Sequence, residues 1–316
     1  MHKISSRRSL LLASAGLLAA PAIPRAAPAA LRVGNQKGGL RSLLEASGGA
    51  SGPDFPIEWS EFPAAAPLLE ALSADALDVG NMGDLAFLSV FASGAPLRAY
   101  AATRADPRSQ AVLVRADSGF RSLADLRGRR VAGNRGGWGQ FLVRAALKRM
   151  GLEPGDGRAR LPRPCGGGAR LPLGRGGCLG HLGAYVSIEV ERFGARVLLD
   201  GTGLTPTISF LAAHENALRQ RRPQLAALMA RQRAGWAWAE SHLPEYAATN
   251  ARLTRLPEEA VRRAFEVQRT RAIPLDSAVI AELQDAADRA VEFGLLRQRL
   301  DVTRALDTGF SLQPGL

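Results

Sequence analysis

The sequence predicts an α/β protein, and three observations support this prediction. From Leu31 onward, short apolar strands alternate with amphipathic helices in strand–helix–strand–helix–strand order, which is typical of parallel sheets covered by helices. A second unit of the same kind begins at Ala111. The chain has 316 residues, enough for two lobes of ordinary domain size. We therefore expect two lobes, each a mostly parallel sheet flanked by helices.

The periodicity of apolar residues places the expected elements along the chain. In the first unit we expect strands at 31–34, 57–62, 77–82 and 98–101 and helices at 40–46, 65–74 and 85–92. In the second unit we expect strands at 111–114, 129–132 and 197–200, a short helix at 122–127 and a helix after the glycine-rich loop that ends at Gln140. An extended segment at 205–212 and helices at 218–240, 243–252, 257–270 and 277–293 complete the chain.

Residues 1–29 have the features of a targeting segment. Arg7 and Arg8 form a twin-arginine pattern, Leu10 to Ala20 is apolar, and Ala27-Pro28-Ala29 offers an A-x-A cleavage site. The apolar stretch is too short for a bilayer, which needs roughly 20 residues. We predict a signal peptide and export to the periplasm. The twin-arginine (Tat) and Sec routes both remain open, because adjacent arginines also occur in Sec signals.

The formal net charge of +12 is concentrated in two stretches. Residues 1–29 hold four basic residues and no acid, and residues 157–184 hold five and no acid. Neither stretch interleaves its charges with aromatic residues on a folded element. We therefore expect no nucleic-acid partner.

Three polar, glycine-bearing loops follow expected strands and precede expected helices, at 35–39, 81–84 and 134–140. The carboxyl ends of parallel strands meet at one edge of a sheet, so these loops should line one crevice. Helix starts present free N–H groups and a partial positive charge, which suit an anion. The candidate ligand-binding residues are Gln36, Lys37, Met82, Gly83, Asp84, Gly136, Gly137, Trp138 and Gln140.

Several of these candidates have two interpretations. Gln36 is a neutral donor or a solvated loop residue, and Lys37 supplies charge to the ligand or is merely exposed. Asp84 caps the helix that follows it or contacts an amine or water. Trp138 forms a wall for the ligand's tail or packs against the other lobe. The glycine spacing of the third loop matches neither GxxxxGK[ST] nor GxGxxG, so the loop alone indicates an anion or polar head group of unspecified kind.

Five segments match one family pattern in order along the chain. They are LRVGNQKG at 31–38, LDVG with Gly83-Asp84 at 77–84, SLADLRG at 122–128, LDGT at 199–202 and SFLAA at 209–213. These segments resemble the periplasmic substrate-binding proteins of sulfonate/taurine-type ABC importers, and the resemblance covers nearly all of 31–310. It implies a two-lobed type II periplasmic binding fold that closes over its ligand by a hinge. Lobe one would comprise 31–107 plus 207–316 and lobe two 108–206, with crossings near 104–109 and 203–208.

The resemblance implies capture of a small organosulfonate, an alkanesulfonate or taurine-like anion, and its delivery to an ABC permease in the inner membrane. The protein would be a monomer without cofactor, metal or enzymatic activity. One alternative is the same fold binding nitrate, bicarbonate or a thiamine-precursor pyrimidine. Another is a desulfinase-like enzyme, which needs a nucleophilic cysteine, whereas Cys165 and Cys178 both lie outside lobe one. Gly136-Gly137-Trp138 departs from the small hydroxyl residues typical of this family loop.

Residues 157–184 show no strand or helix periodicity. The family carries here a strand, a helix and a second strand ending in an A-W-A-I-W-[DE]-P-Y-like run. The residues CLGHLGAY at 178–185 can be encoded by TGC CTG GGC CAT CTG GGA GCC TAT, and a shifted frame of such DNA gives A-W-A-I-W-E. We hypothesise a pair of compensating frameshifts, either in the gene or in its sequencing. The alternative is a genuine Gly/Pro/Arg-rich loop, of a length that is rare inside a compact lobe. If the written residues stand, lobe two loses a central strand, a helix and the family's ligand-facing aromatic and carboxylate, and binding is weak or absent.

Overall fold

The computed structural model describes residues 29–52, 54–126, 131–132, 137–151 and 178–310. The predicted signal peptide, apart from Ala29, lies outside these residues, as do Gly136 and most of the 157–184 stretch. None of the helices in the described ranges combines the length and apolar character that a membrane span requires.

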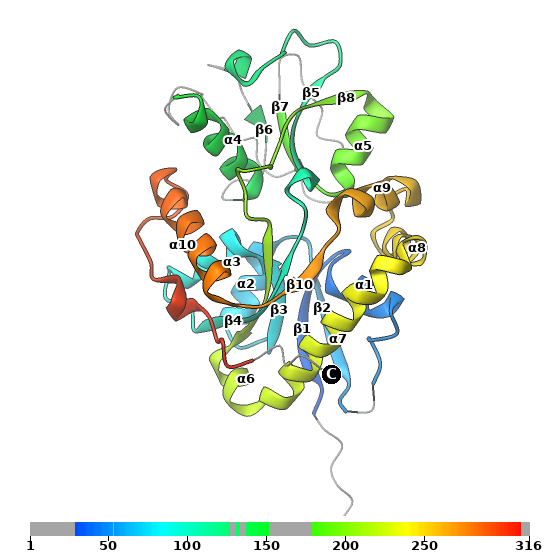
Figure 1. The fold of residues 1–316 in the computed structure, drawn as a ribbon. Coiled ribbons are helices and arrows are strands. Elements are labelled where there is room, and N and C mark those ends of the chain that lie inside the picture. The colour runs from blue at the N-terminus through cyan, green and yellow to red at the C-terminus, as the bar shows by residue number, and fades with distance from the viewer. Residues whose placement is uncertain (1–28, 53, 127–130, 133–136, 152–177, 311–316) are drawn as a thin grey trace, which may run out of the picture.

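The larger of two sheets forms the centre of lobe one (Figure 1). Its strand order is β10-β4-β9-β3-β1-β2. The strands are β1 (Leu31–Gln36), β2 (Ile57–Phe62), β3 (Val79–Gly83), β4 (Leu97–Arg104), β9 (Ile208–His214) and β10 (Arg271–Ile273). β1 pairs in parallel with β2 and with β3, so the polar residues that end β1 and β3 lie at the same edge.

The α/β fold class is confirmed, but the sheets are mixed rather than mostly parallel. β9 returns from lobe two and inserts between β3 and β4, antiparallel to both. β10 then pairs antiparallel with β4 and was not expected from the sequence. The physical reason is the path of the chain. Strand β4 leads from lobe one towards lobe two, whereas β9 enters lobe one from lobe two, so the two strands run in opposite directions.

Helices cover both faces of the larger sheet (Figure 1). Leu68, Phe87 and Phe210 belong to the core on the face covered by α2, α3 and α10, whereas Val33, Tyr100 and Leu228 belong to the core on the other face. The helices of lobe one are α1 (Leu40–Ala46), α2 (Ala65–Ser73), α3 (Asp84–Phe91), α6 (Glu215–Gln220), α7 (Arg222–Ser241), α8 (Leu243–Thr254), α9 (Glu258–Gln268), α10 (Ser277–Glu292) and the 3₁₀ turn η3 (Val302–Ala305).

The single helix expected at 218–240 is instead two helices, α6 and α7. They meet at Arg221, whose φ of −127° is not helical. Pro223 stands in the first turn of α7, where a missing N–H is tolerated, whereas inside one long helix it would remove a hydrogen bond.

The smaller sheet, of order β6-β7-β5-β8, forms the centre of lobe two. Its elements are β5 (Gln110–Arg115), η2 (Leu123–Leu126), β6 (Val131–Ala132), α4 (Trp138–Arg149), β7 (Cys178–Leu182), α5 (Ala184–Phe193) and β8 (Ala195–Asp200). β7 corrects the expectation that 157–184 holds no strand. It pairs antiparallel with β5 and parallel with β6, because backbone hydrogen bonds in a sheet do not require a particular side chain.

Two segments connect the sheets. The first continues from β4 through η1 (Pro107–Ser109) to β5, and the second joins β8 to β9. They are tied together where Ala105 N donates to Thr207 O at 3.1 Å. Helices meet across the lobes on both sides of these segments: Phe141 of α4 packs edge-on against Phe293 at the end of α10, and α5 contacts α9. The lobe boundaries at 107 and 207 remain predictions.

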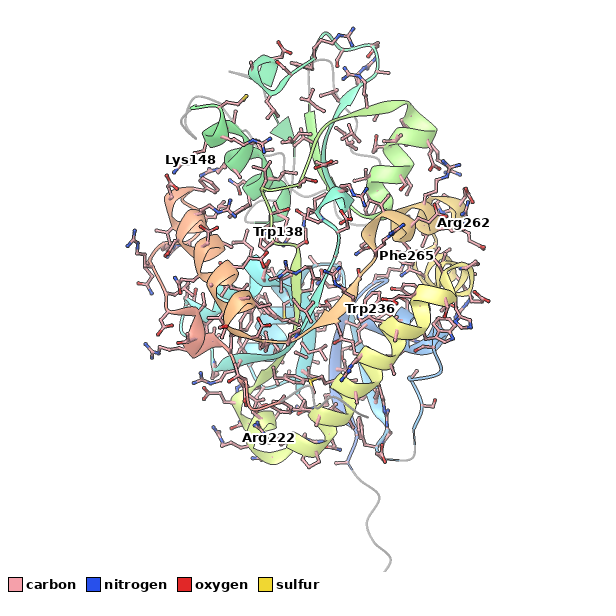
Figure 2. All side chains as sticks on the ribbon, in the orientation of Figure 1. Trp138, Lys148, Arg222, Trp236, Arg262 and Phe265 are labelled. Atoms are coloured by element: carbon pink, nitrogen blue, oxygen red, sulfur yellow. The ribbon has the colours of Figure 1, made fainter. Side chains whose placement is uncertain are left out.

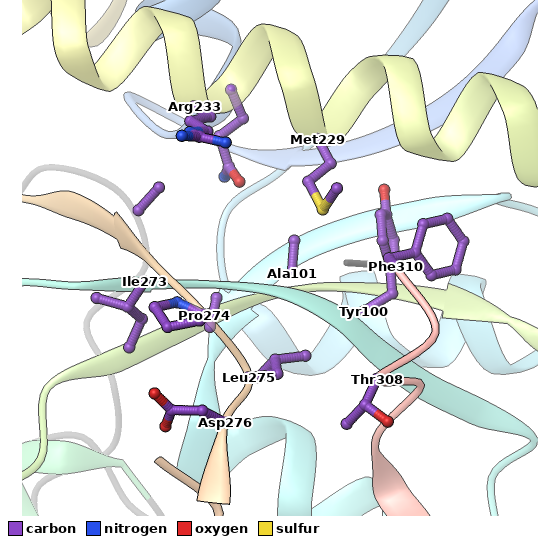
Figure 3. Close-up of a pocket in the computed structure, with 13 residues that line it drawn as sticks. Tyr100, Ala101, Met229, Arg233, Ile273, Pro274, Leu275, Asp276, Thr308 and Phe310 are labelled. Atoms are coloured by element: carbon purple, nitrogen blue, oxygen red, sulfur yellow. The ribbon is translucent and has the colours of Figure 1, made fainter. Parts of the chain in front are cut away.

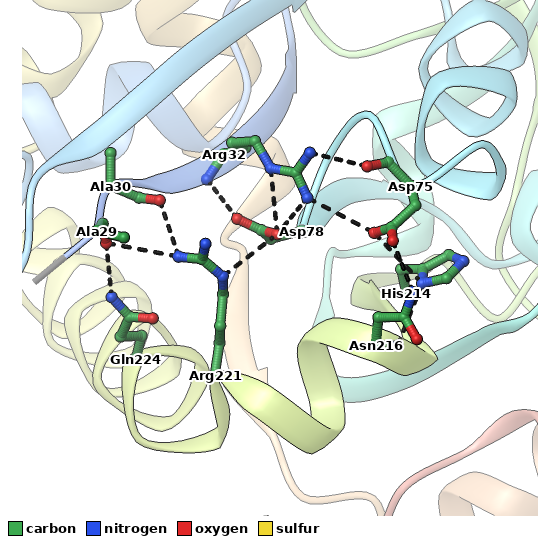
Figure 4. Close-up of polar contacts among 9 residues, drawn as sticks. All are labelled: Ala29, Ala30, Arg32, Asp75, Asp78, His214, Asn216, Arg221 and Gln224. Atoms are coloured by element: carbon green, nitrogen blue, oxygen red, sulfur yellow. Dashed lines mark hydrogen bonds and ion pairs between the residues drawn. The ribbon is translucent and has the colours of Figure 1, made fainter.

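A polar cluster joins β1, the residues just before β3, and helices α6 and α7 (Figure 4). Asp78 is 2 % exposed and accepts hydrogen bonds from the backbone N–H and the guanidinium of Arg32, at 2.8 Å and 2.7 Å. Arg221 approaches the same carboxylate and donates to Ala30 O at 2.9 Å. Gln224 donates to Ala29 O at 2.9 Å, so the first described residues are fastened to α7.

Candidate functional site

The first two predicted loops lie side by side at the carboxyl ends of β1 and β3. Gln36 Nε2 donates to Asn81 O at 3.4 Å, and the position of a Cβ on Gly39 lies 3.8 Å from Asn81 Oδ1. Gly39 N donates back to Gln36 O at 2.8 Å, which turns the chain tightly into α1. The sequence therefore predicted correctly that these loops meet.

The third loop reaches the second from the other lobe. The indole nitrogen of Trp138 lies 3.3 Å from the position that a Cβ on Gly83 would take, so a side chain at 83 would press against the ring. The Trp138 ring packs edge-on against Phe141, with 5.2 Å between centroids. Trp138 lies where the upper and lower parts of the molecule meet (Figure 2). The start of α4 and the end of β3 therefore approach each other closely at this point.

Glycine residues cap all three helices that begin at these loops. The N-caps are Gly39 for α1, Gly83 for α3 and Gly137 for α4, and none of them supplies a side-chain hydrogen bond to its helix. Two first-turn donors are satisfied elsewhere, because Arg41 N donates to Asn35 Oδ1 and Leu85 N donates to Asp84 Oδ1. A glycine cap adds no side-chain acceptor at the helix start, and anion binding at the starts of α3 and α4 stays a prediction.

Asp84 is not the N-cap that one of its two predicted roles required, and the other role, contact with an amine or water, stays a prediction. It is the first residue of α3 rather than its N-cap, and it is buried, 1 % exposed. Burial raises the pKa of its carboxyl well above the usual value, although backbone N–H groups of Leu85 and Ile208 oppose the shift. Its Oδ2 atom has no hydrogen-bond partner within the part of the chain that the structure describes. The side chain therefore points into the protein, next to the start of β9, rather than to solvent.

The other candidates are placed unevenly. Lys37 is exposed on the first loop, whereas Met82 is 1 % exposed in the lobe-one core, so that any ligand contact by Met82 would come from its backbone. Gln140 is buried in the first turn of α4, and its backbone N donates to Gly137 O at 3.1 Å. Gly136 lies outside the described residues.

One polar residue of the crevice was not among the predicted site residues. Asn35 is 1 % exposed at the end of β1, and its Nδ2 has no hydrogen-bond partner among the described residues. Its Oδ1 accepts from Arg41 N at 3.1 Å and so fixes the turn into α1. A polar residue directly after an apolar strand was the signal in the sequence.

The described residues contain no group of three or more His, Cys, Asp or Glu side chains that could hold a metal ion. In the described chain, the arrangement offers uncharged donors at helix N-termini, one exposed lysine and an indole. Such a set suits an anion that is bound mainly by neutral hydrogen-bond donors rather than by several charged side chains.

Comparisons with known proteins agree with this geometry. A family model described as NMT1/THI5 like matches residues 63–159. The chain is 29 % identical over 307 residues to a protein of Escherichia coli (strain K12) assigned to aliphatic sulfonate binding, covering 95 % of this chain and 96 % of that protein. The predicted resemblance is confirmed.

Solved structures extend the similarity to the fold. The alkanesulfonate-binding protein SsuA from Xanthomonas axonopodis pv. citri, bound to MOPS, has a TM-score of 0.78 at 28 % identity, covering 90 % of this chain and 99 % of that one. The periplasmic aliphatic sulphonate binding protein SsuA from Escherichia coli has a TM-score of 0.80 at 28 % identity, covering 89 % and 98 %. The type II periplasmic binding fold is thereby confirmed.

An enzyme shares the fold at greater distance. The desulfurization enzyme DSZB has a TM-score of 0.62 at 18 % identity, which shows likeness of fold alone. The Escherichia coli and Xanthomonas relatives named above are described as binding proteins, and one of them as periplasmic. These relatives support an extracytoplasmic solute-binding role.

Proposed function

We propose that this chain is a solute-binding protein that captures a small organosulfonate outside the cytoplasm and delivers it to an ABC importer. The observation that carries the proposal is the convergence of glycine-capped helix starts from both lobes, where Trp138 of lobe two faces Gly83 of lobe one. A ligand held there would touch both lobes, so binding would favour the closed arrangement.

The hydrogen-bond donors of the proposed site indicate which head group the ligand carries. A sulfonate carries one negative charge over three oxygens, and the first turns of α3 and α4 offer backbone N–H groups and a partial positive charge. Gln36 and the Trp138 indole add neutral donors, and Lys37 adds charge at the rim. The Xanthomonas relative is bound to MOPS, itself an organosulfonate, which supports this choice.

The surrounding biology is proposed from the same resemblance. The chain would leave the cytoplasm by its predicted signal peptide, by the Tat or the Sec route, act in the periplasm as a monomer, and meet an inner-membrane permease. Lobe one would comprise 31–107 plus 207–316, and lobe two 108–206. The ligand's tail would lie against the Trp138 ring, which packs on Phe141 and is held in place by it.

The competing functions differ in what they require. A desulfinase-like enzyme needs a nucleophile in the crevice, and both cysteines of the sequence, Cys165 and Cys178, lie outside lobe one. Nitrate or bicarbonate has no tail to use the Trp138 ring, and a pyrimidine carries no anionic head group for the helix starts. These differences favour the organosulfonate.

A ligand panel tests the proposal. Thermal shifts with alkanesulfonates, taurine, aryl sulfonates, nitrate, bicarbonate and hydroxymethylpyrimidine would be measured on the written chain and on a chain carrying the restored frame at 157–184. We expect a sulfonate to give the largest shift in the frame-restored chain. The absence of a shift with every sulfonate in that chain would contradict the proposal.

A single substitution then tests the geometry. Trp138→Phe keeps an aromatic wall but removes the N–H, and a lost hydrogen bond to a charged group should weaken sulfonate binding by about tenfold to 100-fold. Trp236→Phe, on α7 and packed against Tyr246, is the matched control and should leave the affinity unchanged. Equal affinities for the wild type and Trp138→Phe would remove the indole from the site.

A further inference from the structure

A second cavity lies in lobe one, separate from the crevice. It is bounded by α7, by β4, by the connection from β10 to α10 and by residues 308–310 (Figure 3). Its volume is about 260 Å³. None of its lining residues is among the candidates of the crevice. Its lining includes Tyr100, Met229, Gln232, Ile273, Leu275 and Phe310.

The decisive group is the hydroxyl of Tyr100. The residue is 1 % exposed and lines the cavity, and its hydroxyl has no hydrogen-bond partner within the described chain. The ring is held by Phe310, with 4.8 Å between centroids and 45° between planes. A buried hydroxyl without a partner costs free energy, and an acceptor placed in the cavity would recover it.

The rest of the lining defines what such an acceptor would be attached to. Met229, Ile273, Leu275 and Phe310 give the cavity apolar walls, and Gln232, 4 % exposed, adds an uncharged amide. Figure 3 shows Tyr100, Met229 and Phe310 together at one end and Asp276 towards the other. Apolar walls with a small number of placed polar groups are typical of small-molecule sites.

Charge does not favour an ion in this cavity. The charged lining residues, Arg233 and Asp276, have opposite signs. Asp276 Oδ1 is already occupied, because it accepts from Val279 N at 2.9 Å as the N-cap of α10. The ligand chemistry is therefore different from that of the crevice, where helix starts and a lysine suit an anion.

We propose that this cavity is a second binding site, which takes a small neutral molecule with an apolar body and one carbonyl-type acceptor for the Tyr100 hydroxyl. The site is independent of the sulfonate crevice. Its size suits a single ring or a short alkyl chain rather than a larger metabolite.

The four methionines of the sequence make the test specific. Met229 lines the cavity, Met82 precedes Gly83 of the crevice, and Met150 ends α4. The full chain with ¹³C-labelled methionine methyl groups would be titrated with acetophenone and, as a matched probe of similar shape without an acceptor, with ethylbenzene. We expect acetophenone to shift the Met229 signal saturably in the millimolar range, to leave Met82 in place and to bind more tightly than ethylbenzene.

Variants assign the effect to the hydroxyl. Tyr100→Phe keeps the ring against Phe310 and should weaken acetophenone binding about fivefold to tenfold without affecting ethylbenzene. Tyr246→Phe removes another buried tyrosine hydroxyl, on α8 and away from the cavity, and should change neither.

Three results would overturn the second site: a Met229 signal unmoved by acetophenone, equal binding of the two probes, or equal acetophenone affinity in wild type and Tyr100→Phe. A sulfonate titration on the same sample reports on the crevice through Met82. The two proposals can therefore fail separately.

Discussion

Lobe one and the α5 side of lobe two bury their apolar residues to different degrees. In lobe one, Leu68, Phe87 and Phe210 are all fully buried between the sheet and its helices. Among the described residues of lobe two, the core on the α5 side of the sheet consists of Ala111, Leu113 and Ala195, with Val186 packed against it. Helix α5 and strand β8 of that lobe expose large apolar side chains: Tyr185 is 43 %, Phe193 45 % and Val197 45 % exposed.

This difference coincides with the anomaly in the sequence. The exposed residues of lobe two follow directly after the 157–184 stretch, in which glycine, proline and arginine replace the expected apolar pattern. The strand β7 that ends this stretch is central in its sheet, yet its written sequence CLGHL holds neither a β-branched nor an aromatic residue. The shifted frame would supply tryptophan and isoleucine there. The contrast between the lobes therefore supports the frameshift hypothesis.

The largest expected effect compares one phenylalanine from each lobe. Phe210→Ala removes a fully buried ring that packs edge-on against Phe87 at 5.4 Å, and should lower the free energy of unfolding by about 3–5 kcal/mol. Phe193→Ala, at an exposed position of lobe two, should cost less than about 1 kcal/mol. Urea unfolding measures the loss of unfolding free energy in each variant. Equal losses would contradict the difference in burial between these two positions.

The frameshift hypothesis predicts the next largest effect. Sequencing the gene across codons 150–190 should show the A-W-A-I-W-E frame, and the protein it encodes should be more stable than the written chain. Each large apolar side chain that becomes buried contributes about 1.5–3 kcal/mol, measured as a shift of the urea midpoint. A gene that encodes the written residues in one uninterrupted reading frame would contradict the hypothesis.

The buried carboxyl of Asp84 lowers the free energy of unfolding by an amount that depends on pH. Because burial raises the pKa of its carboxyl, the folded protein holds this proton more tightly than the unfolded chain, whose value is near 3.8. The contribution is favourable at low pH and is lost as pH rises above 3.8. Asp84→Asn, which mimics the protonated form, should gain about 1–3 kcal/mol relative to wild type between pH 4 and pH 7. A difference that does not change with pH, in paired thermal melts, would contradict this assignment.

The smallest expected effect concerns a contact between the lobes. Arg263 of α9 lies 3.1 Å from Glu191 of α5, and both groups are partly solvated. Glu191→Gln should lower the free energy of unfolding by less than about 1 kcal/mol, and added salt should reduce the difference further. A larger loss in urea unfolding would mean that this ion pair, rather than apolar contact, holds α5 against α9.

Local pattern was sufficient for most of the elements. Helix α1 at 40–46 and strand β2 at 57–62 were predicted with the bounds that the structure has, because apolar spacing and polar flanking residues define them locally. Strand β10 was not predicted because its three residues, Arg271–Ile273, show no apolar periodicity. They form a strand because they pair with β4.

The candidate site was predicted in part for the same reason. Glycines and polar residues after strands identified Gln36, Gly83 and Trp138, and the structure brings their loops together. The inward direction of Asp84 and the burial of Met82 could not be inferred, since both depend on what packs around α3 and β3.

The sequence by itself determined the α/β class, the order of the elements and the glycine-capped helix starts, because propensity and hydrophobic period act over a few residues. Only the tertiary structure decided that β9 runs antiparallel between β3 and β4, and that Trp138 meets Gly83 across the lobes. It also decided that the Tyr100 hydroxyl, beside a cavity, has no hydrogen-bond partner among the described residues. Each of these depends on contacts between residues far apart in the chain, and such contacts are set by packing rather than by local pattern.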